Sequence, residues 1–291
     1  MHELVENIFK ALRYGIPKNK GTIYDLRGNG FQQLKPPVFF LSTGRCGTKW
    51  FTELLSFVRT AIVEHDPVPD LGVQGKLAYE IQNDSPFQNK GLILKYLQEL
   101  FLAGREEQLR YAYKTDKRYI ETNNHITFFA PAIAELFPES KFVHLYRHPG
   151  QFVRSAIRRH YYSKDDNRIL KRIIPSENSE YSQRWDSFSP IQKSSWLWFE
   201  TNRFAENFKE QISETRIFNV NFNERNEDTL SRLIAWIQLD ISESKIQGLL
   251  HKEINVQKEG QFVRYEKWNS TQRQELIQIC GNLAEQYGFE L

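Results

Sequence analysis

The chain alternates between short apolar runs and longer stretches in which apolar residues recur at helical spacing. Two runs, Val38–Leu41 and Lys141–Tyr146, are typical of buried strands. Weaker strand patterns lie at 61–63, 119–121 and 217–222. The spacing predicts helices over 3–14, 50–59, 92–109, 127–137 and 150–162, around Phe204 and Phe208, and across 230–237 and 276–287.

This alternation predicts an α/β fold with a central parallel sheet and helices on both of its faces. Ligands of such folds bind in the crevice beyond the carboxyl ends of the strands. Residues 1–34 are interpreted as an N-terminal helix and a connection, and 67–90 as loop-rich. No linker rich in Gly, Ser or Pro divides the chain, so we expect a single domain over 1–291.

Composition narrows the classes of protein to consider. The chain has 291 residues, of which 40% are hydrophobic and 14% aromatic, enough to bury a large core. Its 39 basic and 36 acidic residues leave a net charge of +3. A nucleic-acid-binding domain usually has a stronger basic bias. We therefore predict a local anion site and no nucleic-acid partner.

The cysteine content and the hydropathy of the chain indicate the cellular compartment in which we expect the protein. The two cysteines, Cys46 and Cys280, lie far apart in different contexts, which disfavours a disulfide framework. No apolar run approaches the roughly 18 residues needed to span a bilayer. The N-terminus has the amphipathic spacing of a helix instead of a signal peptide. These features predict a cytoplasmic protein without a membrane span.

The most informative segment is the polar turn Ser42–Lys49, between the first strand and the helix after it. Backbone N–H groups at a helix start have no internal partners and favour a phosphate or sulfate. Arg45 and Lys49 add two positive charges. The segment thus predicts a site for a nucleotide-like polyanion.

This turn differs from the phosphate loop of ATP and GTP enzymes, which is GxxxxGK followed by Ser or Thr. Here two residues separate Gly44 from Gly47, and Thr48 takes the place of the lysine. Trp50 follows Lys49, so no hydroxyl is present there to hold magnesium. We therefore predict a diphosphate-like ligand without a metal.

Two motifs resemble those of the PAPS-dependent sulfotransferases, including the bacterial type with a P-loop-like fold. Residues 45–50, RCGTKW, resemble the 5′-phosphosulfate loop of that family. The strand that ends at Arg147, with Ser155 eight residues later, resembles its 3′-phosphate element. The motifs occur in the order found in the family, and a looser resemblance covers about 35–291.

The resemblance implies roles for the residues of both motifs. Arg45 would stabilise the charge that grows on the oxygen of the departing nucleotide. Arg147 and Ser155 would hold the 3′-phosphate, for which a forked guanidinium is well suited. The remaining PAPS-binding candidates are Cys46, Gly47, Thr48, Lys49 and Trp50. Trp50 would stack on adenine or, equally well, fill the core.

Several residues are candidates for the base that accepts the proton of the acceptor hydroxyl. Asp66 is the first choice because His65-Asp66-Pro67 resembles the carboxylate segment of glycan-type and bacterial members. His65 and Glu64 rank next, and His125 third. The alternative role for Asp66 is to cap a turn before proline.

The predicted function is direct, in-line transfer of the sulfuryl group from PAPS to a hydroxyl of a glycan or small alcohol, leaving 3′-phosphoadenosine 5′-phosphate. The polar, irregular stretch 163–190 would be a lid or an acceptor-binding insertion. The alternatives are a P-loop-type nucleotide kinase and a non-catalytic module that binds a nucleotide or glycan.

Overall fold

A computed structural model describes residues 34–84, 89–252, 254 and 260–291. Five strands form a single parallel sheet in the order β2-β3-β1-β4-β5. The strands are β1 (Val38–Leu41), β2 (Ala61–Glu64), β3 (Arg118–Glu121), β4 (Lys141–Tyr146) and β5 (Ile217–Asn221). β1 lies at the centre, so the turn that follows it faces the crevice between its neighbours.

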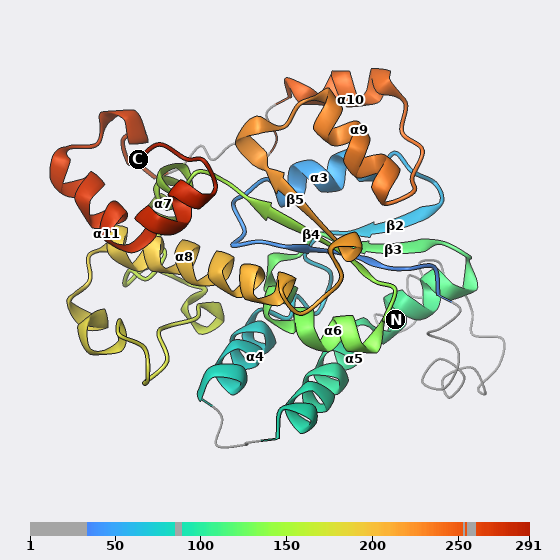
Figure 1. The fold of residues 1–291 in the computed structure, drawn as a ribbon, viewed down its shortest axis with the longest axis horizontal. Coiled ribbons are helices and arrows are strands. Elements are labelled where there is room, and N and C mark those ends of the chain that lie inside the picture. The colour runs from blue at the N-terminus through green and yellow to red at the C-terminus, as the bar shows by residue number, and fades with distance from the viewer. Residues whose placement is uncertain (1–33, 85–88, 253, 255–259) are drawn as a thin grey trace, which may run out of the picture.

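Helices cover both faces of this sheet, which confirms the predicted α/β architecture. In Figure 1, α3, α9 and α10 lie above the sheet, and α4, α5 and α6 lie below it. The helices are α3 (Thr48–Leu55), α4 (Gly72–Asp84), α5 (Lys90–Lys114), α6 (Ala130–Leu136), α7 (Pro149–Ile157), α8 (Pro190–Lys209), α9 (Glu227–Trp236), α10 (Glu243–Leu250) and α11 (Ser270–Gln286). Short 3₁₀ turns include η2 (Asn124–Phe129), η3 (Ile169–Lys171) and η4 (Ser182–Ser187).

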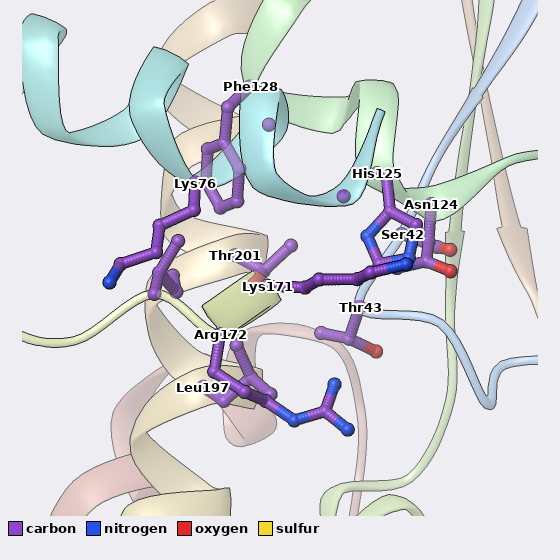
Figure 2. A pocket seen from close by; sticks show the side chains of 13 residues that line it. Ser42, Thr43, Lys76, Asn124, His125, Phe128, Lys171, Arg172, Leu197 and Thr201 are labelled. Carbon is purple, nitrogen blue, oxygen red and sulfur yellow. The ribbon is translucent and has the colours of Figure 1, made fainter. Parts of the chain in front are cut away.

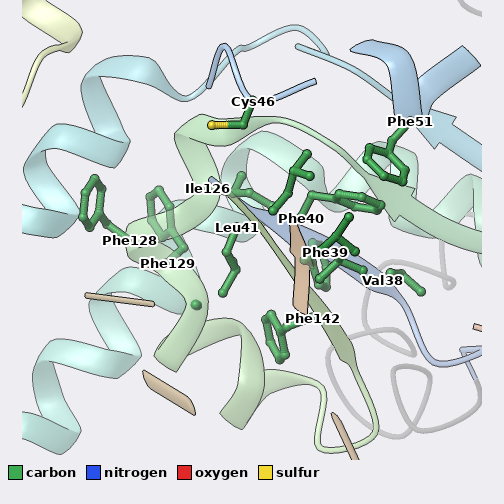
Figure 3. Packing of buried hydrophobic residues seen from close by; sticks show 14 of the residues in the cluster. Val38, Phe39, Phe40, Leu41, Cys46, Phe51, Ile126, Phe128, Phe129 and Phe142 are labelled. Carbon is green, nitrogen blue, oxygen red and sulfur yellow. The ribbon is translucent and has the colours of Figure 1, made fainter. Parts of the chain in front are cut away.

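The apolar run of β1 is explained by burial on both faces of the sheet. Successive side chains of a strand point to opposite faces. Phe39 packs against Phe101 of α5 with ring centroids 5.8 Å apart, and Phe40 packs against Phe51 of α3 at 5.4 Å (Figure 3). All four side chains of β1 are fully buried. Burial on both faces therefore explains why β1 shows no alternation of apolar and polar residues in the sequence.

Three sequence predictions of local structure are wrong, one of them the helix expected over 150–162, because α7 ends at Ile157. The stretch 67–90, expected to be loop-rich, contains the helix α4. Gly75 of this helix is buried and packs against η2 by its backbone, so one position of the buried face carries no apolar side chain. A Cβ at Gly75 would lie 2.2 Å from the carbonyl oxygen of His125. The helix after the anion turn is also shorter than expected, since α3 ends at Leu55 instead of near 59.

Other expectations concern the rest of the chain. The predicted helix at 3–14 and most of the connection up to 34 lie outside the described residues. Cys46 and Cys280 are both buried and free, as expected. Within the described part of the chain, no helix combines the length and apolar character needed to cross a membrane.

Candidate functional site

The turn between β1 and α3 has a backbone conformation that depends on glycine. Gly44, Arg45 and Gly47 all have positive φ angles, of 72°, 56° and 101°. A Cβ on Gly47 would lie 2.1 Å from the Phe222 ring, so only glycine fits there. The turn can therefore approach a ligand with its backbone, and α3 begins directly after it.

Hydrogen bonds to η2 and within the turn hold the turn in place. The Ser42 N–H donates to Thr127 Oγ1 at 3.0 Å, and the Gly44 N–H donates to Ser42 Oγ at 3.1 Å. Cys46 Sγ lies 2.9 Å from Thr43 Oγ1. Burial raises the pKa of the Cys46 thiol, which keeps it protonated. The geometry suits a small buried filler better than a nucleophile.

The structure brings Arg45, Arg147 and Ser155 together. β1 and β4 are neighbours, and Arg147 follows the last residue of β4. Arg147 Nη1 lies 3.4 Å from the carbonyl oxygen of Arg45, and Arg45 Nε lies 3.4 Å from Ser155 Oγ. Ser155 stands on α7, which starts at Pro149 with His148 as its N-cap. The two motifs, 102 residues apart, thus meet at one edge of the sheet.

We call Arg45, Arg147, Ser155 and the nearby Arg225 the arginine edge. Among the residues that the structure describes, its three arginines form no ion pair with a carboxylate. Burial lowers the pKa of Arg147, and the like charges of Arg225 and Arg45 lower it further. A concentration of partly buried, uncompensated positive charge favours an anionic ligand.

Two arginines at this edge, Arg225 and the additional Arg159, are not indicated by the sequence motifs. Arg159, just beyond the end of α7, donates from Nη1 to Ser155 Oγ at 3.0 Å. Its pKa is lowered to about 10, first by burial and then by Arg45. The Arg225 guanidinium lies 4.2 Å from the Phe222 ring centre. Only the sheet order could have identified Arg225, because it follows β5, the neighbour of β4.

The other candidates from the first motif lie at different depths. Trp50 is 2% exposed, and its indole N–H donates to the carbonyl oxygen of Leu249 at 3.2 Å. This placement is that of a core aromatic. Thr48 is buried at the start of α3, and Lys49 is exposed beside it.

The candidate bases lie near the end of β2. His65 Nδ1 is 3.1 Å from Thr122 Oγ1, and His65 Nε2 is 3.8 Å from Asp66 Oδ2. Asp66 is 44% exposed and has a φ of 49°. Burial lowers the pKa of His65, Asp66 opposes that shift, and Lys49 and Arg45 add to it. The positive charges of the anion turn therefore act on the pKa of His65. Glu64 precedes it as the last residue of β2.

His125 lines a separate hollow, which we call the recess. Its walls come from the anion turn, η2, α4, α8 and η3, and include Thr43, Asn124, Phe128, Lys171, Ile173 and Leu197. Figure 2 shows Lys171 extending toward His125 and Asn124. Burial lowers the pKa of His125 to about 4, against the opposing effect of Asp66 and Asp70. The stretch 163–190 thus contributes a wall to this recess.

A buried ion pair supports the segment between β2 and α4. Arg105 and Glu121 are both fully buried, with Arg105 Nη2 2.7 Å from Glu121 Oε1. Arg105 Nη1 also donates to the carbonyl oxygen of Pro69 at 2.6 Å. Asn123 donates to the carbonyl oxygen of Asp70 at 2.9 Å and to Glu121 at 3.2 Å. These contacts hold the loop that carries Asp66 and Asp70 against the sheet.

Comparisons with solved structures identify the fold. The structure is similar to a sulfotransferase domain from the curacin biosynthetic pathway, with 14% identity, coverage of 89% of this chain and 99% of that one, and a TM-score of 0.51. It is also similar to the sulfotransferase STF9 from Mycobacterium avium, with 13% identity, coverage of 93% and 81%, and a TM-score of 0.52. No protein-family model and no curated protein matches the sequence. With its parallel sheet of five strands and its helices on both faces, this chain has the sulfotransferase fold.

Proposed function

We propose that the protein transfers the sulfuryl group of PAPS to a hydroxyl of an acceptor. The observation that carries this proposal is the meeting of Arg45, Arg147 and Ser155 at one edge of the sheet. Two guanidinium groups that lack carboxylate partners in the described structure suit a ligand with two anionic groups. PAPS has such groups in its 5′-phosphosulfate and its 3′-phosphate. The fold supports the proposal by analogy.

In this proposal each motif holds one end of the nucleotide. The backbone N–H groups of Gly47, Thr48 and Lys49 bind the 5′-phosphosulfate at the start of α3. Arg147 and Ser155 bind the 3′-phosphate, which ATP and ADP lack. Arg159 already contacts the Ser155 hydroxyl and adds a second cation near that phosphate.

The chemistry is an in-line displacement at sulfur. The acceptor oxygen forms a bond to sulfur while the bond from sulfur to the bridging oxygen of the 5′-phosphate breaks. The electron pair of that bond stays with 3′-phosphoadenosine 5′-phosphate, and Arg45 stabilises the growing charge. The hydroxyl proton passes to Asp66 or to His65, which lies beside it at 3.8 Å.

Two measurements test the proposal on the wild-type protein. Calorimetry should show tighter binding of 3′-phosphoadenosine 5′-phosphate than of ATP with magnesium. Radiolabelled PAPS should give labelled product with at least one alcohol of an acceptor panel. Preference for ATP with magnesium would instead indicate a kinase, and nucleotide binding without transfer would indicate a non-catalytic module.

A substitution tests the role of Arg45. Arg45→Ala should lower turnover by about 10²–10³-fold, the usual effect of losing one donor to a developing anion. Affinity for the product nucleotide should change much less, because the 3′-phosphate contacts remain. Arg232→Ala is a matched control, since Arg232 is 63% exposed and pairs with Asp228 on the surface of α9. Unchanged turnover in Arg45→Ala would exclude the role.

A further inference from the structure

Three polar side chains form a series of hydrogen bonds between the end of β2 and the helix of the anion turn. His65 Nδ1 lies 3.1 Å from Thr122 Oγ1, and Thr122 Oγ1 lies 2.8 Å from Thr52 Oγ1. Thr52 Oγ1 in turn donates to the carbonyl oxygen of Thr48 at 3.0 Å, within α3. We call His65, Thr122 and Thr52 the His65 network.

The parallel sheet places these groups side by side. Glu64 and Glu121 are partners in the register of β2 and β3, so the residues that follow them leave the sheet together. These residues are His65 and Thr122. α3 packs against β2 and brings Thr52 to them. Thr122 is fully buried, where a hydrogen bond that is not made is costly. We therefore expect the network to make every hydrogen bond that its protons allow.

The number of protons in the network decides which nitrogen of His65 carries the hydrogen. Each threonine hydroxyl has one proton to donate, and a carbonyl oxygen can only accept. Because Thr52 donates to the Thr48 carbonyl, it accepts from Thr122. Thr122 has then used its proton and can only accept from His65. The same holds if Thr122 donates to the carbonyl oxygen of Glu64, which lies 3.3 Å away.

The opposite arrangement makes fewer hydrogen bonds. If Thr122 donated to His65, Thr52 would have one proton for two contacts. Donation to the Thr48 carbonyl would leave the two hydroxyl oxygens 2.8 Å apart with no proton between them. Donation to Thr122 would leave both carbonyl contacts unmade. The network therefore favours a proton on Nδ1 of His65.

This tautomer leaves a lone pair on the other ring nitrogen of His65, Nε2. Nε2 lies 3.8 Å from Asp66 Oδ2, which is too far for a good hydrogen bond but close enough for the carboxylate to stabilise a charged ring. Burial lowers the pKa of His65, Asp66 raises it, and Lys49 and Arg45 lower it further. The ring is thus neutral before the reaction, and Asp66 stabilises it once it has gained a proton.

We propose that His65 is the general base and that Thr122 and Thr52 are positioning residues that keep its lone pair on Nε2. The inference rests on the proposed function and names the group that takes the proton of the acceptor. As the acceptor oxygen bonds to sulfur, its O–H bond breaks and the proton passes to Nε2. The imidazolium then releases a proton to solvent. Thr52 belongs to α3, whose first N–H groups hold the phosphosulfate in the proposed function, so α3 fixes the base relative to the donor.

Nitrogen NMR of protein with isotope-labelled histidine tests the tautomer without any substrate. The His65 signals are identified by their loss in His65→Asn. Above pH 7, wild type should show the proton on Nδ1 and none on Nε2. Thr122→Val keeps the shape of the side chain but removes the hydroxyl, so this preference should be lost, and Thr122→Ser should restore it. A wild-type ring with its proton on Nε2 would overturn the inference by itself, even if a variant failed to fold.

Kinetics test the positioning role on the same variants. Thr122→Val should lower kcat with PAPS by about 3- to 10-fold, the usual effect of losing one hydrogen bond, and should leave the affinity for 3′-phosphoadenosine 5′-phosphate unchanged. Thr52→Val should have a smaller effect, because Thr122 can still donate to the Glu64 carbonyl. Thr115→Val is the matched control and should behave as wild type. Its hydroxyl also bonds to the carbonyl four residues before it, that of Tyr111, but at the exposed end of α5.

The outcomes separate this inference from the proposed function. Sulfuryl transfer at the wild-type rate in His65→Asn or in Thr122→Val would overturn the inference alone. A protein with the expected tautomer that transfers no sulfuryl group to any acceptor would overturn the proposed function, while the arrangement of His65 by Thr122 would stand.

Discussion

The arginine edge and the recess both lie beyond the carboxyl ends of the parallel strands, but they differ in how their positive charges are compensated. At the arginine edge, the guanidinium groups of Arg147 and Arg225 lie 5.5 and 4.2 Å from the centre of the Phe222 ring, and the described structure gives neither a carboxylate partner. In the recess, Lys171 and Arg172 each contact an aspartate. Leaving a partly buried cation without a counter-ion is costly, so it marks a place where the ligand brings the negative charge. Where the protein supplies that charge itself, an anionic ligand gains little.

The largest expected effect comes from breaking the buried pair that supports the recess. Glu121→Ala leaves the Arg105 guanidinium buried with only carbonyl partners, which should lower the free energy of unfolding by about 3–5 kcal/mol. Urea denaturation followed by tryptophan fluorescence measures the loss. The double variant Arg105→Met/Glu121→Met should recover most of it, because no unpaired charge remains. A loss below about 1 kcal/mol in Glu121→Ala would mean that water reaches the pair.

The same variant sharpens the comparison between the two regions. Arg105 holds the Pro69 carbonyl, and through that loop it positions Asp66 and Asp70. No contact of the pair reaches the arginine edge in the described structure. In the folded fraction of Glu121→Ala, KM for the acceptor should therefore rise, while affinity for 3′-phosphoadenosine 5′-phosphate should stay near the wild-type value.

The next effect concerns the uncompensated charge itself. Arg147→Met should weaken binding of 3′-phosphoadenosine 5′-phosphate by about 10- to 100-fold, the usual loss for a hydrogen-bonded charged group. Lys76→Met is the matched change at the recess, where Lys76 already pairs with Glu80, and it should leave nucleotide affinity unchanged. Calorimetry measures both. An Arg147→Met variant that binds the nucleotide as well as wild type would remove the assignment of the 3′-phosphate site.

Three residues of the arginine edge, Arg45, Arg147 and Ser155, could be predicted from sequence because each of the two motifs is local, whereas Arg225 lies outside both motifs. The turn at 42–49 and the strand that ends at Arg147 have recognisable residues at fixed spacing, and a parallel sheet brings strand ends together. The recess could not be predicted in this way. Its walls come from five separate elements, and Gly75 is needed only because the His125 backbone packs against it. Neutralisation of Lys171 by Asp70 also joins residues 101 positions apart, which no short motif records.

A smaller, pH-dependent effect reports which group accepts the acceptor proton. Burial lowers the pKa of His65 below its ordinary 6.5, so the ring is neutral at pH 7 and able to accept a proton. With His65 as the base, kcat/KM should fall as the pH drops through that lowered pKa. Lys49→Met removes a positive charge that lowers the pKa, so the midpoint should move to higher pH. Asp66 would be assigned as the base if three results were found together. The midpoint of the pH profile would be the same in Lys49→Met as in wild type, His65→Asn would be active, and Asp66→Asn would be inactive.

The smallest expected effect comes from the ion pair between Asp70 and Lys171 at the recess. Burial alone would raise the pKa of Asp70, but hydrogen bonds from Lys171 and the Gly72 N–H outweigh it and leave the pKa below its ordinary 3.8. Because the folded-state pKa is lowered, the stabilisation is present above pH 3.8 and is lost as the pH falls through the folded value. Both side chains are partly exposed, so Asp70→Asn should lower the free energy of unfolding by only about 0–1 kcal/mol at pH 7. Urea titrations at neutral and acidic pH should show wild type and variant converging in acid. A difference in the free energy of unfolding that persists at acidic pH would mean that Asp70 acts through packing. The balance of charge in the recess would then rest on the ion pairs of Arg172 and Lys76 alone.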